Sequence, residues 1–237
     1  MNSTTSSIPD TLKRQAAAKA LDLVESRMVL GLGTGSTVAH FLDLLGIKLG
    51  QGALVDVVGV PTSLRTEREA RQAGIPLVSL AEYPSLDLAV DGADEVSPEL
   101  DLIKGMGGAL LREKMVAQAA ARFVVIADAG KSVSRLGTLS PLPVEVVDWG
   151  WSGHKAFLER QGAVVSVRRF EDGPPFKSDN GNLILDCGFP DGIPDPDALE
   201  SALKKRAGVV ETGLFLGLAT EAILAGPGGL EIRRRPS

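Results

Sequence analysis

The chain has 237 residues, of which 44% are hydrophobic, and a formal net charge of -5 at pH 7. This length and composition can bury a substantial core without disulfides, so we expect a folded globular protein. The acidic balance argues against a nucleic-acid-binding protein, and a single cysteine, Cys187, excludes an internal disulfide framework and fits a reducing compartment.

The sequence also lacks the patterns of a metal site, a membrane span and a leader peptide. Only His40 and His154 offer imidazole ligands, and the carboxylates show no metal-loop spacing. No apolar stretch reaches the length of a membrane span, and residues 1–9 resemble neither a signal nor a transit peptide. We therefore expect a cytoplasmic protein without a metal, a nucleic-acid partner or a membrane partner, and we interpret the basic residues 233–235 as a solvated end.

Segments of helical periodicity alternate with short aliphatic runs along the first half of the chain. This is the pattern of parallel βαβ units, and it predicts an α/β sheet. The expected elements are a helix over 11–25 capped by Asp10 or Thr11, a strand over 28–32, a helix over 36–45, strands over 54–60, 77–80 and 86–90, and a buried strand over 122–127.

A second unit is expected after Leu136, where prolines and two tryptophans change the composition. Its predicted elements are a helix over 152–161, a strand over 164–168, a hairpin with a type I′ turn at Asn180-Gly181, and a helix over 197–205. This order predicts a small α+β lobe of ferredoxin-like type, after which the chain returns to the first sheet around 213–218. The expected domains are therefore 1–136 with 207–237, and a lobe over 137–206.

Residues 31–37, Gly-Leu-Gly-Thr-Gly-Ser-Thr, connect a predicted strand to the next helix. Glycines without a Cβ let N–H groups around Gly35 converge on an anion at the helix N-terminus, and Thr34, Ser36 and Thr37 add hydroxyl donors. The string matches neither the Walker loop nor the dinucleotide fingerprint. We predict a phosphate or sugar site here; the alternative is a tight turn in which Ser36 caps the helix.

Two carboxylates follow the apolar run 86–90: Asp91 and Asp94, separated by Gly92 and Ala93. Both should lie just past the carboxyl end of a strand, where ligands collect in open α/β sheets. The alternative is a plain polar turn, because Asp-Gly is a common turn pair.

A second glycine cluster, residues 104–108, opens another predicted helix that carries Glu113. Lys104 suits the neutralisation of a phosphate or a developing oxyanion, and Glu113 suits a general base. Lys131 follows a strand end and is expected to meet the same anion. Each of these residues also has a simpler interpretation as a solvated charge.

Several strings, in this order along the chain, resemble the signatures of the type A ribose-5-phosphate isomerase family. They are residues 31–37, 91–95, 104–114, 126–128 with Lys131, 141–146, 179–182 and 213–215. The resemblance implies metal-independent and cofactor-free interconversion of D-ribose 5-phosphate and D-ribulose 5-phosphate in the non-oxidative pentose phosphate pathway. It also implies a Rossmann-like, mostly parallel sheet flanked by helices, and a homodimer or homotetramer, for which we assign oligomerisation to the lobe over 137–206.

The same resemblance implies roles for individual residues. Glu113 would move a proton between C1 and C2 through a cis-enediolate, and Asp91 would assist ring opening with Asp94 nearby; Lys104 completes the catalytic set. The expected substrate-binding residues are Thr34, Gly35, Ser36, Thr37, Asp91, Gly92, Ala93, Asp94, Lys104, Gly105, Met106, Gly107 and Lys131. Met106 departs from the family, which commonly has glycine there, so the loop either keeps φ negative at this position or is strained.

Other functions share this kind of architecture. A sugar-phosphate-sensing regulatory protein would keep the glycine turn without needing Glu113, but no helix-turn-helix and no basic face are evident. An amino-sugar-phosphate deaminase should need a catalytic histidine in a matching motif, and a CoA transferase would use a glutamate as nucleophile towards a thioester.

Overall fold

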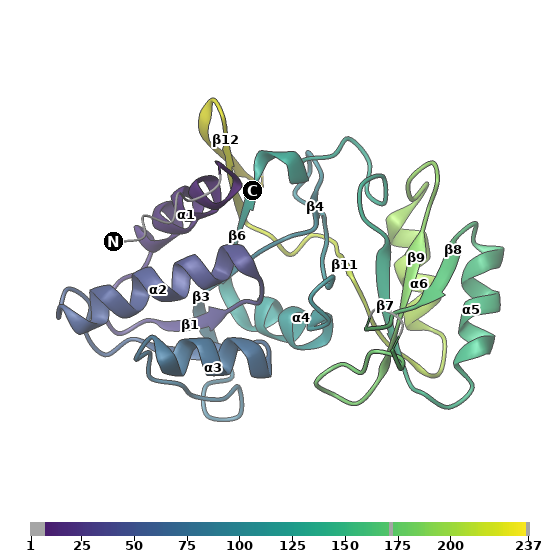
Figure 1. The fold of residues 1–237 in the computed structure, drawn as a ribbon, viewed down its shortest axis with the longest axis horizontal. Helices are drawn as coiled ribbons and strands as arrows, with labels where there is room; N and C mark the ends of the chain where they lie inside the picture. The colour runs from purple at the N-terminus through teal and green to yellow at the C-terminus, as the bar shows by residue number, and fades with distance from the viewer. Residues whose placement is uncertain (1–7, 171–172, 236–237) are drawn as a thin grey trace. The chain divides into compact units, whose positions relative to one another are not determined.

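The computed structural model describes residues 8–170 and 173–235, and the chain folds into two compact units (Figure 1). Unit 1 combines Met1–Gly92, Val116–Gly130 and Thr220–Ser237, and unit 2 combines Ala93–Met115 and Lys131–Ala219. Compared with the expected division at 136 and 207, residues 93–115, 131–136 and 207–219 lie with the second unit.

Unit 1 is built on a mostly parallel sheet with the strand order β13-β12-β6-β3-β1-β2, in which β13 pairs antiparallel at the edge. Its strands are β1 (Val29–Leu32), β2 (Val58–Pro61), β3 (Leu86–Asp91), β6 (Ala120–Asp128), β12 (Glu221–Gly226) and β13 (Gly229–Arg234). Its helices are α1 (Ile8–Leu21), α2 (Ser36–Gly50) and α3 (Leu64–Gln72), and the last residues of α4 (Leu110–Ala119) also belong to it. The expected α/β class is confirmed.

Alternation along the strands divides the core of unit 1 between the two faces of the sheet. Leu30 and Leu32 belong to a buried cluster with Phe41 of α2 and the alanines of α1. Gly31, between them, faces the other way, because a Cβ there would lie 2.4 Å from Val116 of α4. Small residues on this face therefore let α4 approach the sheet closely.

The order of the strands places the carboxyl ends of β1 and β3 side by side. β1 pairs in parallel with β2 on one side and with β3 on the other. This is the point where strand order reverses, and open α/β sheets bind their ligands there. The glycine turn after β1 and Asp91 at the end of β3 consequently lie together in unit 1.

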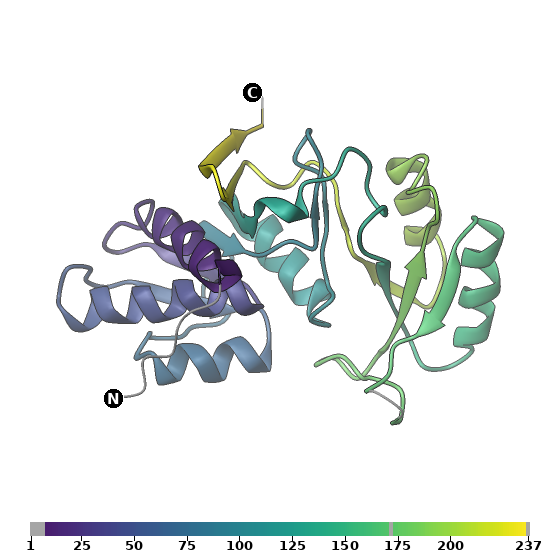
Figure 2. The same ribbon diagram turned by 45° about the horizontal axis from the view of Figure 1, so that its top comes forward.

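Unit 2 contains an antiparallel sheet with the order β10-β7-β9-β8 and a short sheet of β11, β5 and β4. The strands are β4 (Glu95–Val96), β5 (Leu102–Ile103), β7 (Leu142–Val146), β8 (Val164–Val167), β9 (Leu183–Gly188), β10 (Val209–Thr212) and β11 (Leu214–Phe215). Helices α5 (Trp151–Arg160) and α6 (Pro196–Lys204) pack on one face of the four-stranded sheet (Figure 2). There Leu158 and Leu203 join Val144 and Leu185 in a buried cluster. The β-α-β-β-α-β order confirms the ferredoxin-like lobe.

Several predicted elements differ in their extent. α1 begins at Ile8, so Asp10 lies inside the helix rather than capping it, and its carboxylate is 3.0 Å from His40 Nε2. The strand predicted over 54–60 starts only at Val58, because Asp56 has a left-handed φ of 58°. The strand predicted over 77–80 is absent from the described residues, where Leu77 makes an isolated bridge and Ser79 turns to bond Glu82.

The turn at 178–182 is a hairpin, but not of the predicted type. Ser178 N donates to Asn182 O, and Gly181 N donates to Ser178 O. Only Gly181, with φ 81°, is left-handed, whereas a type I′ turn needs positive φ at both central residues. The Asn-Gly pair therefore serves a type I turn followed by a left-handed glycine.

The predicted return of the chain over 213–218 is also wrong. Leu214 and Phe215 form β11, which pairs antiparallel with β5 in unit 2. Gly213 donates to Pro143 O and accepts from Lys104 N, and these bonds hold the segment in unit 2. The chain rejoins the first sheet at β12. Two residues of the basic end, Arg233 and Arg234, lie in the exposed edge strand β13 and not in a tail.

Candidate active site

In unit 1, Asp91 is the residue around which the glycine turn is built. Its side chain is buried, and Oδ1 accepts hydrogen bonds from Thr34 N at 3.0 Å and Gly92 N at 2.7 Å. A Cβ on Gly33 would lie 2.2 Å from the Asp91 carboxyl group, so only glycine fits beside it. The structure thus brings together Asp91, Gly92 and the turn after β1, as the sequence predicted.

The hydroxyl of Thr34 is used inside the protein. Its Oγ1 lies 2.8 Å from the hydroxyl oxygen of Thr62 and 2.9 Å from those of Ser63 and Thr66. Ser63 also caps α3 by accepting from Thr66 N. Sequence reasoning missed this hydroxyl cluster, because its members follow β2 in a segment without a recognisable motif.

The rest of the glycine turn starts α2. Gly35, with φ 130°, is the N-cap residue and makes no side-chain cap, so the alternative in which Ser36 caps the helix is wrong. Ser36 is exposed and Thr37 is half-buried. Lys13 Nζ of α1 donates to Ser36 Oγ at 2.9 Å, which adds a cation to this turn. Lys13 was missed because it looks like any charged residue on a helix face.

In unit 2, Lys104 and Glu113 form a buried ion pair. Lys104 Nζ lies 3.3 Å from Glu113 Oε1, and their side chains are 2% and 4% exposed. The ring of Phe215 lies close to two ammonium groups, with its centroid 5.5 Å from Lys104 Nζ and 5.0 Å from Lys114 Nζ. The structure therefore joins two predicted catalytic residues and adds an aromatic face beside Lys104.

Lys114, next to Glu113 in the chain, has its own buried partner. Its Nζ donates to Glu211 Oε1 at 2.7 Å and to Glu200 Oε1 at 3.2 Å. Burial raises the pKa of Glu211, but the charge of Lys114 and hydrogen bonds from both Lys114 and Lys204 outweigh it, so the pKa is lowered overall. Glu211 thus stays charged beside Lys114, and Glu113 is the carboxylate that faces Lys104.

The loop over 104–108 is held by Asp94. Met106 N donates to Asp94 Oδ2 at 3.0 Å. Gly105 and Gly108 have φ of 104° and 82°, whereas Met106 is outside the left-handed region, so the loop accommodates this side chain without the strain considered above. Of the other predicted residues, Ala93 is half-buried, Gly107 is exposed, and Lys131 is half-buried in a single 3-10 turn, Ala129–Lys131.

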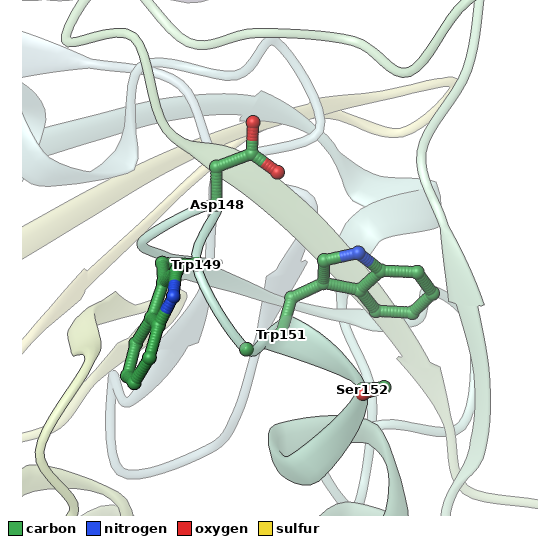
Figure 3. Close-up of a pocket in the computed structure, with 5 residues that line it drawn as sticks. Asp148, Trp149, Trp151 and Ser152 are labelled. Carbon is green, nitrogen blue, oxygen red and sulfur yellow. The ribbon is translucent and has the colours of Figure 1, made fainter.

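Two pockets lie elsewhere on the chain. One, of about 480 Å³, is lined by residues 148–152, and Figure 3 shows Trp149 and Trp151 extending in different directions from its wall. The other, of about 600 Å³, is formed in unit 1 by loops around Gly50 and Gly74. Neither pocket is lined by a predicted site residue.

The described residues offer neither a metal site nor a membrane span. Over 8–170 and 173–235, histidines, cysteines and carboxylates form no group of three that could hold a metal ion. In that same part of the chain, no helix combines the length and the apolar character that crossing a bilayer requires.

Comparison with known proteins identifies the family. The family model of ribose 5-phosphate isomerase A (phosphoriboisomerase A) matches residues 58–229. The chain is 52% identical over 233 residues to ribose-5-phosphate isomerase A of Chloroflexus aurantiacus, covering 98% of this chain and 95% of that protein. It is 49% identical over 228 residues to probable ribose-5-phosphate isomerase 3, chloroplastic, of Arabidopsis thaliana, covering 94% and 83% respectively.

Solved structures agree with this match. A D-ribose-5-phosphate isomerase in complex with phospho-erythronic acid superimposes with a TM-score of 0.93 at 40% identity, covering 97% of this chain and 100% of that one. Ribose 5-phosphate isomerase from Plasmodium falciparum has a TM-score of 0.93 at 36% identity, covering 96% and 100%. This chain, with its glycine turn, its aspartates at positions 91 and 94 and its Lys104–Glu113 pair, therefore belongs to the ribose 5-phosphate isomerase A family.

Proposed function

We propose that this enzyme, an aldose–ketose isomerase by family, interconverts D-ribose 5-phosphate and D-ribulose 5-phosphate with Glu113 as the base. Support comes chiefly from one observation: a carboxylate and an ammonium group, Glu113 and Lys104, face each other at 3.3 Å in a buried part of unit 2. Family membership disfavours a regulatory protein, a CoA transferase and a deaminase.

The proposed reaction starts from the open-chain aldose. Glu113 removes the proton from C2, the C–H electron pair forms the C1–C2 double bond, and the aldehyde oxygen O1 becomes negatively charged. One hydroxyl proton then passes from O2 to O1, and Glu113 returns its proton to C1 while the carbonyl forms at C2. No atom is gained or lost, and no redox partner is required.

Lys104 stabilises the negative charge that develops on the sugar oxygens. Buried ions interact more strongly than exposed ones because less water screens them, and fixed charges of this kind are worth about 10²–10³ in rate. The Phe215 ring lies beside the Lys104 ammonium group, at 5.5 Å, and limits the water that can screen it. Lys104 is therefore assigned to enediolate stabilisation and Glu113 to proton transfer.

We assign Asp91 to ring opening and proton exchange at the ring oxygen, with Asp94 as a further catalytic residue. Two amides hold Asp91 in place, and Asp94 holds the 104–108 loop. The proposed substrate contacts remain those of the sequence analysis, with Lys13 added to the phosphate-binding residues because its ammonium group reaches Ser36.

Replacing Glu113 by Gln tests this proposal. The amide keeps the size of the side chain but cannot accept the proton, so kcat for ketose formation from ribose 5-phosphate should fall by about 10²–10⁴ while substrate affinity changes little. Glu159→Gln, in the exposed half of α5, is the matched control and should behave as wild type. A Glu113→Gln enzyme that keeps more than about a tenth of the rate would contradict the assignment.

We also propose that the enzyme is a homodimer or homotetramer formed through residues 137–206 and works in the cytoplasm. Trp149, Val164 and Phe170 in this lobe are 91%, 70% and 60% exposed, and association would remove these large apolar side chains from water. The single cysteine suits a reducing compartment. Sedimentation analysis and cell fractionation measure these two properties directly.

A further inference from the structure

Arg168, just after β8, contacts the loop over 104–108 through its guanidinium group. Nη1 donates to the carbonyl oxygens of Gly105 and Met106, both at 2.9 Å, and Nη2 lies 3.6 Å from Met106 Sδ. All these residues belong to unit 2. One side chain thus holds two consecutive peptide groups in a loop that we assign to substrate binding.

Asp186 of β9 fixes the guanidinium from the other side. Arg168 Nε and Nη2 donate to Asp186 Oδ2 and Oδ1, and the two side chains are only 11% and 16% exposed. Asp186 alternates along β9 with Leu185 and Cys187, which pack under α5 and α6, so it points to the opposite face of the sheet. The fork geometry of arginine lets one residue bind a carboxylate and two carbonyls together, which lysine cannot do.

The carbonyl contacts determine where the loop amides point. In a trans peptide the C=O and the next N–H lie on opposite sides. The Gly105 carbonyl faces Arg168, and the Met106 N–H accordingly points away, to Asp94 Oδ2 at 3.0 Å. Because the Met106 carbonyl also faces Arg168, the Gly107 N–H is turned away from the guanidinium in the same manner.

The loop needs such an external constraint. Gly105 and Gly108 adopt left-handed φ angles and lack a Cβ, so the chain itself restricts these peptides weakly. Donors that stabilise a developing anion are effective only when they are oriented before the reaction. We propose that Arg168, held by Asp186, is a positioning residue of the isomerase, which orients the peptides over 105–107 so that the Met106 amide binds Asp94 and the Gly107 amide faces the sugar phosphate. This inference rests on the proposed function of the loop.

The variants Arg168→Ala and Arg168→Lys test it, with Arg169→Ala as the matched control. Arg169 is the exposed neighbour and donates to Gly173 O, away from the loop. The measurements are kcat and KM for ketose formation, the affinities for phospho-erythronic acid and for inorganic phosphate, and the thermal unfolding midpoint. The carboxylate of phospho-erythronic acid presents two oxygens, as an enediolate does, whereas inorganic phosphate needs only the phosphate-binding groups.

For Arg168→Ala we expect kcat to fall by about 10- to 100-fold, as expected for small misplacements of catalytic groups. Affinity for phospho-erythronic acid should fall about tenfold, while affinity for inorganic phosphate stays unchanged. Arg168→Lys should fold and still lose kcat, because one amine cannot hold both carbonyls beside Asp186. Arg169→Ala should match wild type in every measurement.

Several results would overturn the inference. A folded Arg168→Ala enzyme with wild-type kcat would do so, and so would an equal loss in Arg169→Ala. If Arg168→Ala does not fold, Arg168→Lys becomes the test. A wild-type kcat in that variant would show that Arg168 is not a positioning residue. Parallel losses of phosphate affinity and thermal stability would assign Arg168 to the fold alone. Failure of the proposed function appears differently, as wild-type enzyme without ketose formation or as an active Glu113→Gln variant.

Discussion

Gly33 is the most tightly constrained residue of the glycine turn. It has no need of an unusual backbone angle, but the Asp91 carboxyl group occupies the space where its Cβ would lie, at 2.2 Å, and even Asp91 Cα would be only 2.6 Å away. The carboxylate that accepts the Thr34 and Gly92 amides can thus sit against the turn only because the side chain at position 33 is a hydrogen atom.

Gly33→Ala should therefore displace Asp91 and lower the free energy of unfolding by about 1–3 kcal/mol, the usual cost of overpacking. Activity should fall with it, because Asp91 loses its two amide partners. Gly50→Ala is the control, since a Cβ there meets open space at the end of α2. Urea unfolding and ketose formation measure both effects, and equal behaviour of the two variants would refute the argument.

At the scale of elements, Glu145 connects β7 to the 178–182 hairpin. Its buried Oε1 accepts from Ser178 Oγ at 2.8 Å, Asn180 Nδ2 at 3.1 Å and Asn182 Nδ2 at 2.9 Å. Asn180 in turn accepts from Arg112 Nε at 3.0 Å, and Arg112 precedes Glu113 on α4. The hairpin thereby links the four-stranded sheet of unit 2, which contains β7, to α4, the helix that carries the proposed base Glu113.

Glu145→Leu should remove the shared acceptor and leave buried donors without a partner, each worth about 1–3 kcal/mol. We expect the free energy of unfolding to fall by several kcal/mol, on the order of 3. Glu145→Gln keeps an accepting oxygen and should cost clearly less. Denaturant titrations with fixed m-values make the comparison, and equal losses in the two variants would show that packing, and not hydrogen bonding, is what matters.

At the scale of the whole molecule, each unit has its own buried cluster. One contains the helices and strands of unit 1, and the other contains the lobe built on β7, β8 and β9. Separate cores allow separate unfolding transitions, so one free energy need not describe the chain. Conditions that weaken one core alone should reveal this.

Acid is such a condition, because His154 lies in the core of unit 2. Burial and the nearby charge of Arg206 lower its pKa below the ordinary 6.5, and its Nδ1 accepts from Arg206 Nε in the neutral form. In the window between the lowered pKa and 6.5, the unfolded state binds more protons, so stability rises with pH and is lost as pH falls. The stabilisation that neutral His154 contributes is fully present above pH 6.5.

We therefore expect the unfolding free energy of unit 2 to drop between pH 7 and pH 5, and His154→Gln to flatten this pH dependence. Thermal unfolding at several pH values provides the measurement, and an NMR titration of the histidine gives its pKa. An unchanged pH profile in His154→Gln would show that other groups control the acid response.

The sequence by itself determined the family, the parallel sheet of unit 1 and the ferredoxin-like lobe. Periodic apolar residues and glycine turns are local signals. The motifs at 31–37, 91–95 and 104–114 are each a contiguous stretch of sequence, so they can be recognised without the structure. The roles of Glu113, Asp91, Asp94 and Lys131 stay predictions; Glu113→Gln tests the first of them directly and Gly33→Ala tests the second through the displacement of Asp91.

Only the tertiary structure decided how Met106 fits its loop, where the chain rejoins the sheet, and which residues hold the loop in place. Arg168 and Met106 are 62 positions apart, and Arg112 and Asn180 are 68 apart. Such contacts depend on strand register and on the packing of whole elements. No local propensity encodes them, which is why an ordinary arginine after a strand gave no indication of its partners.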